Sequence, residues 1–210
     1  MIKKNLKLLL ITSAVILLPI LAGLIMWDHL PDLIPIHWNI SGEIDGWSSK
    51  PLAVLGMPLF LLALQWVAVL TTATDPKKHN HSGKILHFVF WIIPVLSIVL
   101  STFTYSAAIG KTIPVGMLVS LLLGLLFVII GNYLPKCQQN YTIGIRLPWT
   151  LHSEENWNKT HRLSGWIWVI GGIGVMIAGI FEFIWLTVSL FLMICLVPLI
   201  YSYILHRRGI

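Results

Sequence analysis

The sequence predicts an all-α, polytopic membrane protein with six transmembrane helices and with both termini in the cytoplasm. Hydrophobic residues make up 57% of the 210-residue chain, and charged residues make up only 10%. The hydrocarbon core of a bilayer is about 30 Å thick and needs roughly 20 apolar residues of helix, a length that six stretches reach. Nearly all basic residues fall in loops on one side of these stretches.

Four of the apolar stretches are separate from one another. They lie at Leu6–Trp27, Pro51–Thr72, Leu86–Ile109 and Val115–Leu134. The run from 163 to 205 is about twice as long as one span. It contains a single charged residue, Glu182, and therefore predicts two helices that turn near Glu182–Trp185. The first stretch is too long for a secretory signal and has no small-x-small cleavage site, so we expect it to remain as the first helix.

The basic residues predict the orientation, because Lys and Arg in short loops are retained in the cytoplasm. With the N-terminus inside, only Lys50 and Lys111 of the 14 Lys and Arg residues lie outside. The opposite orientation would invert this distribution. The cytoplasmic charges are divided among four short segments and make no continuous patch, so the +6 net charge predicts a topology and not nucleic-acid binding.

The predicted spans contain few groups that could carry ions or protons. Gln65 and the hydroxyls are the strong polar candidates, whereas His87 and Glu182 lie near span ends. An ion-coupled transporter normally needs a charged group deep among its helices, so the sequence disfavours that class. Cys137 and Cys195 lie at different depths and predict neither a disulfide nor a metal site. We expect no cofactor.

Small residues recur every fourth position in two of the predicted spans. They are Gly116, Ser120 and Gly124 in the fourth span, and Gly174 and Ala178 in the fifth. Small side chains allow helix backbones to approach closely in lipid. We interpret both stripes as packing surfaces within the chain, with dimerisation as the alternative.

The first loop, residues 28–50, has the chemistry of a structured cap outside the membrane. Pro31 and Pro35 favour an extended chain, residues 34–39 could form a short strand, and turns are expected at Ser41-Gly42 and Asp45-Gly46. A metal site is a weaker alternative. It would use His29, His37, Glu43 and Asp45, but no helical or Cys/His spacing brings the four together.

The loop between the fourth and fifth spans, residues 131–162, contains a predicted helix. Ser153 can cap residues 154–161, in which Trp157 and His161 share a face. We expect this helix to lie along the membrane surface and run into the fifth span, with Trp149 and Trp157 dipping into the interface. Two arginines of this loop would then either meet phosphates or the Glu154/Glu155 pair, or form a docking surface. They are Arg146 and Arg162.

These elements predict three parts of the chain. Residues 1–72 form an N-terminal helical hairpin with the structured loop 28–50, and residues 73–134 form a central helical hairpin. Residues 131–210 form a cytoplasmic loop with a C-terminal helical hairpin.

Four motifs in the 131–162 loop resemble the signature of the SdpI family. They are Gly131-Asn132-Tyr133-Leu134, Gly144-Ile145-Arg146-Leu147-Pro148-Trp149-Thr150-Leu151, Glu155-Asn156-Trp157 and Thr160-His161-Arg162. Leu147 departs from the pattern, which has Thr or another small residue there. The first loop is similar to a domain of unknown function that precedes this signature in many members. Its matching motifs are Leu30-Pro31, Ile34-Pro35-Ile36-His37-Trp38 and Gly42-Glu43-Ile44-Asp45-Gly46-Trp47.

The resemblance implies an immunity protein of the bacterial cytoplasmic membrane that protects its host from a secreted, membrane-active peptide toxin. The resemblance also implies a signalling role, because the family's founding member holds a small autorepressor at the membrane when toxin is bound. The candidate residues for a cytoplasmic partner are Arg146, Trp149, Trp157, His161 and Arg162. The candidate toxin-facing residues are His37, Trp38, Glu43, Asp45 and Trp47. The expected partners are thus the lipid bilayer, a peptide toxin and a repressor protein. The sequence does not predict an oligomeric state.

Two other functions are weighed against this one. A transporter or exporter of a small amphipathic molecule is disfavoured by the lack of buried charge and of an internal repeat. A membrane-embedded enzyme would use His152, Glu155 and His161, but this spacing is not the i, i+4 pair of helical zinc sites. We therefore expect a binding protein and no catalytic residues.

Overall fold

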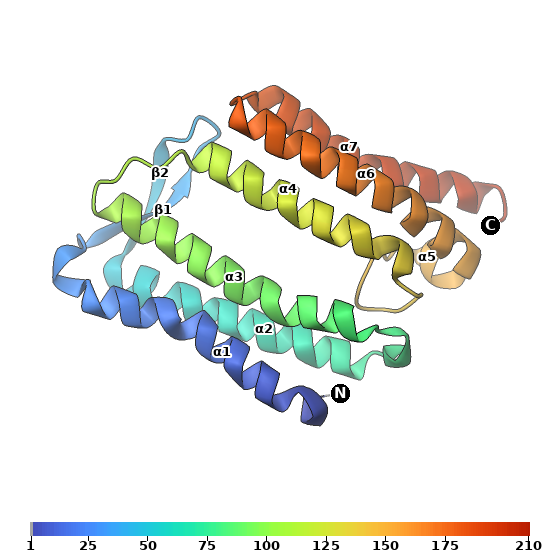
Figure 1. The fold of residues 1–210 in the computed structure, drawn as a ribbon, viewed down its shortest axis with the longest axis horizontal. Coiled ribbons are helices and arrows are strands. Elements are labelled where there is room, and N and C mark those ends of the chain that lie inside the picture. Colours follow the sequence, from blue (N-terminus) through green and yellow to red (C-terminus); the bar gives the residue numbers. More distant parts are fainter. Residues whose placement is uncertain (1) are drawn as a thin grey trace. The chain divides into compact units, whose positions relative to one another are not determined.

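The computed structural model describes residues 2–210, except the side chains of residues 2–4 and of Lys84. Six long helices dominate this part of the chain (Figure 1), and each contains a segment long and apolar enough to cross a membrane. They are α1 Ile2–Ile25, α2 Met57–Thr74, α3 Gly83–Ala108, α4 Val115–Tyr133, α6 Glu154–Ile180 and α7 Ile184–Arg207. The prediction of six spans is confirmed. The last two helices are separated at residues 181–183, where Glu182 adopts a positive φ of 56°.

The chain forms two compact units. The first comprises Met1–Thr74 and Gly83–Val115, and the second comprises Asp75–Ser82 and Gly116–Ile210. We call Asp75–Ser82 the connector. It joins α2 to α3 along the chain, although both of these helices belong to the first unit.

In the first unit, α1, α2 and α3 pack side by side (Figure 1) around a small polar centre. Gln65 is 1% exposed, and its Nε2 donates to Thr12 Oγ1 at 2.8 Å and to the carbonyl of Phe90 at 3.1 Å. These bonds link α2 to both α1 and α3. A buried amide is costly in lipid unless it is hydrogen-bonded, so the polar residue singled out within the spans ties three helices together.

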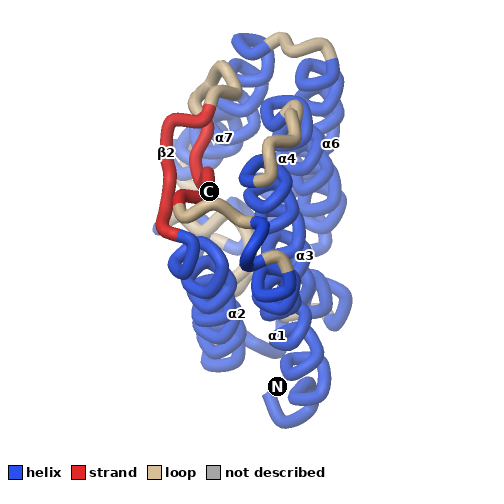
Figure 2. The backbone as a smooth tube through the Cα atoms, turned by 90° about the vertical axis from the view of Figure 1, so that its left-hand side faces the viewer, coloured by secondary structure: helices blue, strands red, loops and turns tan. Residues whose placement is uncertain are grey.

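The loop after α1 is a β-hairpin, which we call the outer hairpin. Its strands β1 (Leu33–Trp38) and β2 (Ile44–Ser49) are antiparallel and appear in red in Figure 2. At the turn, Asn39 Oδ1 accepts hydrogen bonds from the N–H groups of Ser41 and Glu43, at 2.9 and 3.0 Å. Ile34 is fully buried against the first unit. The predicted strand is therefore confirmed, and the loop is an ordered cap of its own unit.

In the second unit, small residues let α4 approach α6 closely. A Cβ added at Gly124 would lie 2.5 Å from the carbonyl oxygen of Gly172, and one added at Gly131 would lie 3.0 Å from that of Gly165. Ser120, in the same stripe, lies against Gly179. Gly174 faces Leu190 of α7. The interpretation of both stripes as packing within the chain is therefore confirmed, except at Gly116, where an added Cβ would meet no described atom within 4 Å.

Gly124→Leu is expected to prevent the second unit from packing, because a leucine has no space against the backbone of α6. We expect membrane levels to fall several-fold, measured by immunoblot of isolated membranes. The same substitution at Gly116 serves as the control and should leave the level close to wild type. Equal levels for Gly124→Leu and Gly116→Leu would contradict this packing.

The N-inside orientation remains a prediction, and exposed positions in the structure provide its test. Ser41, on the turn of the outer hairpin, and Asn158, on the first turns of α6, are both exposed. In a chain with Cys137 and Cys195 replaced by alanine, Ser41→Cys should react with an impermeant maleimide in intact cells, whereas Asn158→Cys should react only after permeabilisation. The reverse pattern would overturn the orientation.

Candidate functional site

The segment between α4 and α6 is folded around a buried asparagine. It contains the short helices η4 (Leu134–Lys136) and α5 (Pro148–His152). Asn140 is 1% exposed, and its Oδ1 accepts hydrogen bonds from the N–H groups of Thr142 and Ile143 at 2.9 and 2.7 Å. Its Nδ2 donates to the carbonyls of Gln138 and Ile143. One side chain thus closes the loop of residues 137–153, which we call the inner loop.

The inner loop is anchored on a pair of stacked rings in the first turns of α6. Trp157 and His161 are fully buried, with ring centroids 4.0 Å apart. The indole N–H of Trp157 donates to the carbonyl of Cys137 at 2.7 Å. His161 Nε2 accepts the N–H of Ile145 at 3.0 Å, and its Nδ1 lies 2.8 Å from the carbonyl of Trp157. This arrangement requires a neutral imidazole with its proton on Nδ1.

Gly144 is fixed by the same two rings. Its φ is 116°, a conformation that favours glycine, and a Cβ there would lie 2.5 Å from His161 Nε2. The motif residues Gly144, Trp157 and His161 therefore form one structural unit, which explains their offsets in the sequence.

A second set of bonds ties the inner loop and α6 to α7. The indole N–H of Trp149 donates to Ser202 Oγ at 2.6 Å, and its ring stacks on His206. Asn156 is buried, donates through Nδ2 to the carbonyl of Ser202 and accepts from the hydroxyl of Ser202. Ser153 accepts the N–H of Asn156, which confirms the predicted helix cap.

The candidate cytoplasmic residues divide into exposed and buried groups. Arg146 and Arg162 are exposed, and Arg146 Nη1 donates to the carbonyl of Tyr141 at 3.0 Å. Trp149 is half-buried. The expectation that Trp157 dips into the membrane interface is wrong, because its ring is enclosed by the protein and its N–H is used internally. Only the exposed members can meet a partner directly.

The connector contributes a buried pair, Asp75 and His81, that the sequence did not predict. The Asp75 carboxylate accepts the N–H of Lys77 at 2.7 Å, the N–H of Tyr141 at 3.0 Å and the hydroxyl of Thr142 at 2.8 Å. His81 Nε2 lies 3.2 Å from Asp75 Oδ2, and both side chains are at most 1% exposed.

The ionisation of Asp75 follows from these contacts. Burial by itself would raise the pKa of this carboxyl, but the three hydrogen bonds and the charge of His81 outweigh it and hold the pKa below its ordinary value of 3.8. The carboxylate is therefore charged at neutral pH. Because the folded pKa is the lower one, this stabilisation is present above the unfolded pKa and is lost as the pH falls through the folded value.

The candidate toxin-facing residues all lie on the outer hairpin. His37 Nδ1 lies 2.5 Å from Asp45 Oδ1, and both side chains are exposed. Glu43 accepts from Asn39 Nδ2, Trp47 is 54% exposed and Trp38 is half-buried. The hairpin thus presents acidic and aromatic groups together.

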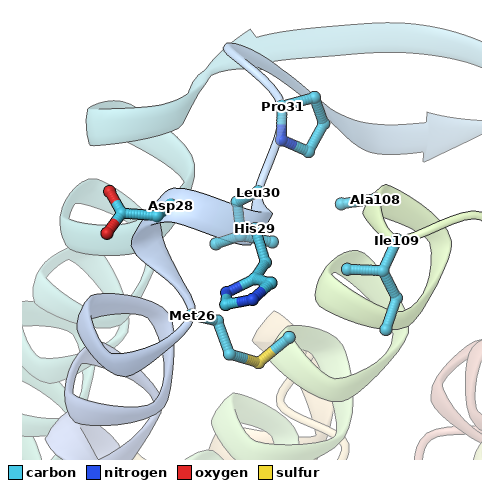
Figure 3. Close-up of a pocket in the computed structure, with 7 residues that line it drawn as sticks. All are labelled: Met26, Asp28, His29, Leu30, Pro31, Ala108 and Ile109. Atoms are coloured by element: carbon cyan, nitrogen blue, oxygen red, sulfur yellow. The ribbon is translucent and has the colours of Figure 1, made fainter.

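A cavity that the sequence did not indicate opens beside this hairpin in the first unit (Figure 3). It has a volume of about 720 Å³ and lies where η1 (Trp27–His29) meets the end of α3. Its lining residues are Met26, Asp28, His29, Leu30, Pro31, Ala108 and Ile109. Asp28 points away from the apolar pair Ala108 and Ile109 (Figure 3), so its carboxylate does not face that side of the cavity.

The three residues of the possible zinc enzyme, His152, Glu155 and His161, do not form a common site. His152 Nδ1 lies 2.5 Å from the carbonyl of Pro148, Glu155 pairs with Lys159 at 2.7 Å, and both ring nitrogens of His161 are occupied. Within residues 2–210, no group of three His, Cys, Asp or Glu side chains is placed to hold a metal ion.

Together, six spanning helices, an ordered outer hairpin and a folded inner loop define a multi-pass integral protein of the cell membrane. Residues 136–202 match the SdpI/YfhL protein family, and residues 14–62 match a domain of unknown function, DUF1648. The family match covers the inner loop, α6 and most of α7. It is 26% identical to the immunity protein SdpI of Bacillus subtilis strain 168 over 197 residues, which are 93% of this chain and 91% of that protein. No solved structure matches the chain.

Proposed function

We propose that this protein is a membrane immunity protein that protects its host from a secreted, membrane-active peptide toxin. The observation that carries the proposal is the similarity to the immunity protein SdpI along 93% of the chain, because it includes both the outer hairpin and the inner loop. The proposed role is that of a binding protein and not of an enzyme.

The outer hairpin is the proposed contact for the toxin. Its exposed Trp47 offers an apolar surface, and the same hairpin carries the exposed acidic residues Glu43 and Asp45. Such a surface suits an amphipathic peptide, since the few residues that dominate binding energy in interfaces are enriched in tryptophan. The adjoining cavity extends this surface toward the end of α3.

The inner loop is the proposed contact for a cytoplasmic repressor. Arg146 and Arg162 are exposed, and the guanidinium group has the planar donor geometry that recognises carboxylates. The bonds to α6 and α7 hold the loop in one conformation, which lowers the entropy cost of binding a partner.

Expression in a sensitive host tests the immunity function. In Bacillus subtilis strain 168 with its SdpI gene deleted, this chain should restore survival in spent medium from the parent strain. Cells that make SdpI are the positive control, and cells that make the Gly124→Leu variant are the negative control. If the wild-type chain reaches the membrane at the level of SdpI and survival equals that of cells with an empty vector, the proposal is wrong.

A further inference from the structure

The connector Asp75–Ser82 has an unusual position in the chain. It is eight residues long and follows α2 directly, and α3 begins at the residue after it. Both helices pack in the first unit, but the connector packs in the second. Any displacement of the connected ends of α2 or α3 therefore acts on a segment that is bonded to the inner loop.

These bonds reach from the connector into the body of the inner loop. Asp75 accepts from Tyr141 and Thr142, as described above. Asn80 Nδ2 donates to the carbonyl of Gln139 at 2.7 Å, and Lys77 Nζ donates to the side-chain oxygen of the same glutamine.

Gln139 continues this chain of contacts into α5. Its Nε2 donates to the carbonyls of Thr150 and Leu151, at 2.8 and 3.1 Å. A continuous hydrogen-bonded path therefore runs from both ends of the connector to the helix that carries Trp149.

The buried pair at the centre of this path is not fully satisfied. His81 Nε2 lies 3.2 Å from Asp75 Oδ2 and 3.1 Å from Thr142 Oγ1, so both neighbours share one ring nitrogen. The other nitrogen, Nδ1, is buried and has no hydrogen-bond partner among the described residues. A catalytic triad would use both nitrogens, so the cluster does not have that geometry.

An unsatisfied buried nitrogen raises the free energy of the closed arrangement, whereas the contacts of Asp75 lower it. Loss of either side chain would leave the other buried without its partner, so Asp75 and His81 together stabilise the closed arrangement.

We propose that the connector is a latch that transmits movement of α2 and α3 to the inner loop. The Asp75–His81–Thr142 cluster holds the latch closed, and its opening releases the inner loop and changes the surface that carries Arg146. This inference rests on the signalling part of the proposed function and assigns it a route through the protein.

Cys137 provides a readout that needs no toxin. Its side chain is buried within the inner loop, and burial raises the pKa of the thiol, so it should react slowly with a water-soluble maleimide. In purified full-length protein with Cys195→Ala, His81→Gln should increase the labelling rate of Cys137 by at least about tenfold. Asp75→Asn should act in the same direction. His79→Gln, at an exposed position of the same connector, should label like wild type.

A second pair of variants tests transmission from the first unit. A Cβ at Gly23 would lie 2.6 Å from Val54 Cγ1, so Gly23→Ala disturbs the packing of α1 within that unit. Tyr105→Phe is a milder disturbance, because it removes the hydroxyl that donates to the carbonyl of Pro19. Each change is combined with a padded connector, in which Gly-Ser is inserted after Thr74 and after Ser82.

We expect Gly23→Ala or Tyr105→Phe to accelerate labelling of Cys137 with the native connector but not with the padded one. Equal acceleration with both connectors, or none with either, would overturn the latch, as would labelling of His81→Gln at the wild-type rate. Survival in spent medium is measured in parallel. A chain that protects cells but shows no coupling keeps its immunity function and loses only the latch.

Discussion

Trp157→Ala is expected to release the inner loop from α6 while the six helices remain in the membrane. Replacement of a fully buried tryptophan by alanine typically costs about 3–5 kcal/mol. Here it also leaves the carbonyl of Cys137 without its donor and removes the ring on which His161 stacks. We expect Cys137 to become accessible to a water-soluble maleimide, and the inner loop to become sensitive to limited proteolysis.

Two variants separate this effect from a general loss of aromatic area. Trp166 lies on the same helix and is 67% exposed, so Trp166→Ala should change neither labelling nor proteolysis. Trp157→Phe keeps an aromatic ring but loses the indole N–H, and it should give an intermediate labelling rate. If Trp157→Ala labels like Trp166→Ala, the stacked pair does not anchor the loop.

The spanning helices could be predicted because their signal is local. A run of about 20 apolar residues has one stable conformation in lipid, since every backbone polar group must be satisfied within the segment. The start of α6 was also predictable, because Ser153 and the two acidic residues after it form a cap that can be read from neighbouring positions.

The contacts of Asp75 and Asn140 could not be predicted in the same way. Asp75 lies 66 residues before Tyr141, and no periodic pattern relates the connector to the inner loop. The prediction that Trp157 lies in the membrane interface is wrong for a related reason. A tryptophan near a span end suits the lipid interface as well as a protein interior, and only the distant carbonyl of Cys137 decides between them.

The two exposed surfaces are expected to carry separable functions. Arg146 is exposed and donates a hydrogen bond to the carbonyl of Tyr141, so Arg146→Ala should change stability far less than Trp157→Ala. If the exposed guanidinium recognises a repressor, Arg146→Ala abolishes signalling and leaves protection intact, and Arg146→Lys restores signalling only in part. The measurement is a reporter for the operon that encodes the protein, together with survival in spent medium.

Trp47→Ala is expected to have the opposite effect and to weaken protection first. Trp47 is 54% exposed on the outer hairpin, and the loss of an aromatic anchor typically costs about 2 kcal/mol or more of binding free energy, which is a decrease in affinity of roughly 30-fold. Trp185→Ala, at an exposed position at the start of α7, controls for the loss of a tryptophan from the surface. Membrane levels of all variants are compared by immunoblot. If Arg146→Ala and Trp47→Ala reach wild-type levels and each loses both activities in parallel, the outer hairpin and the inner loop act as one conformational unit and the two-surface model is wrong.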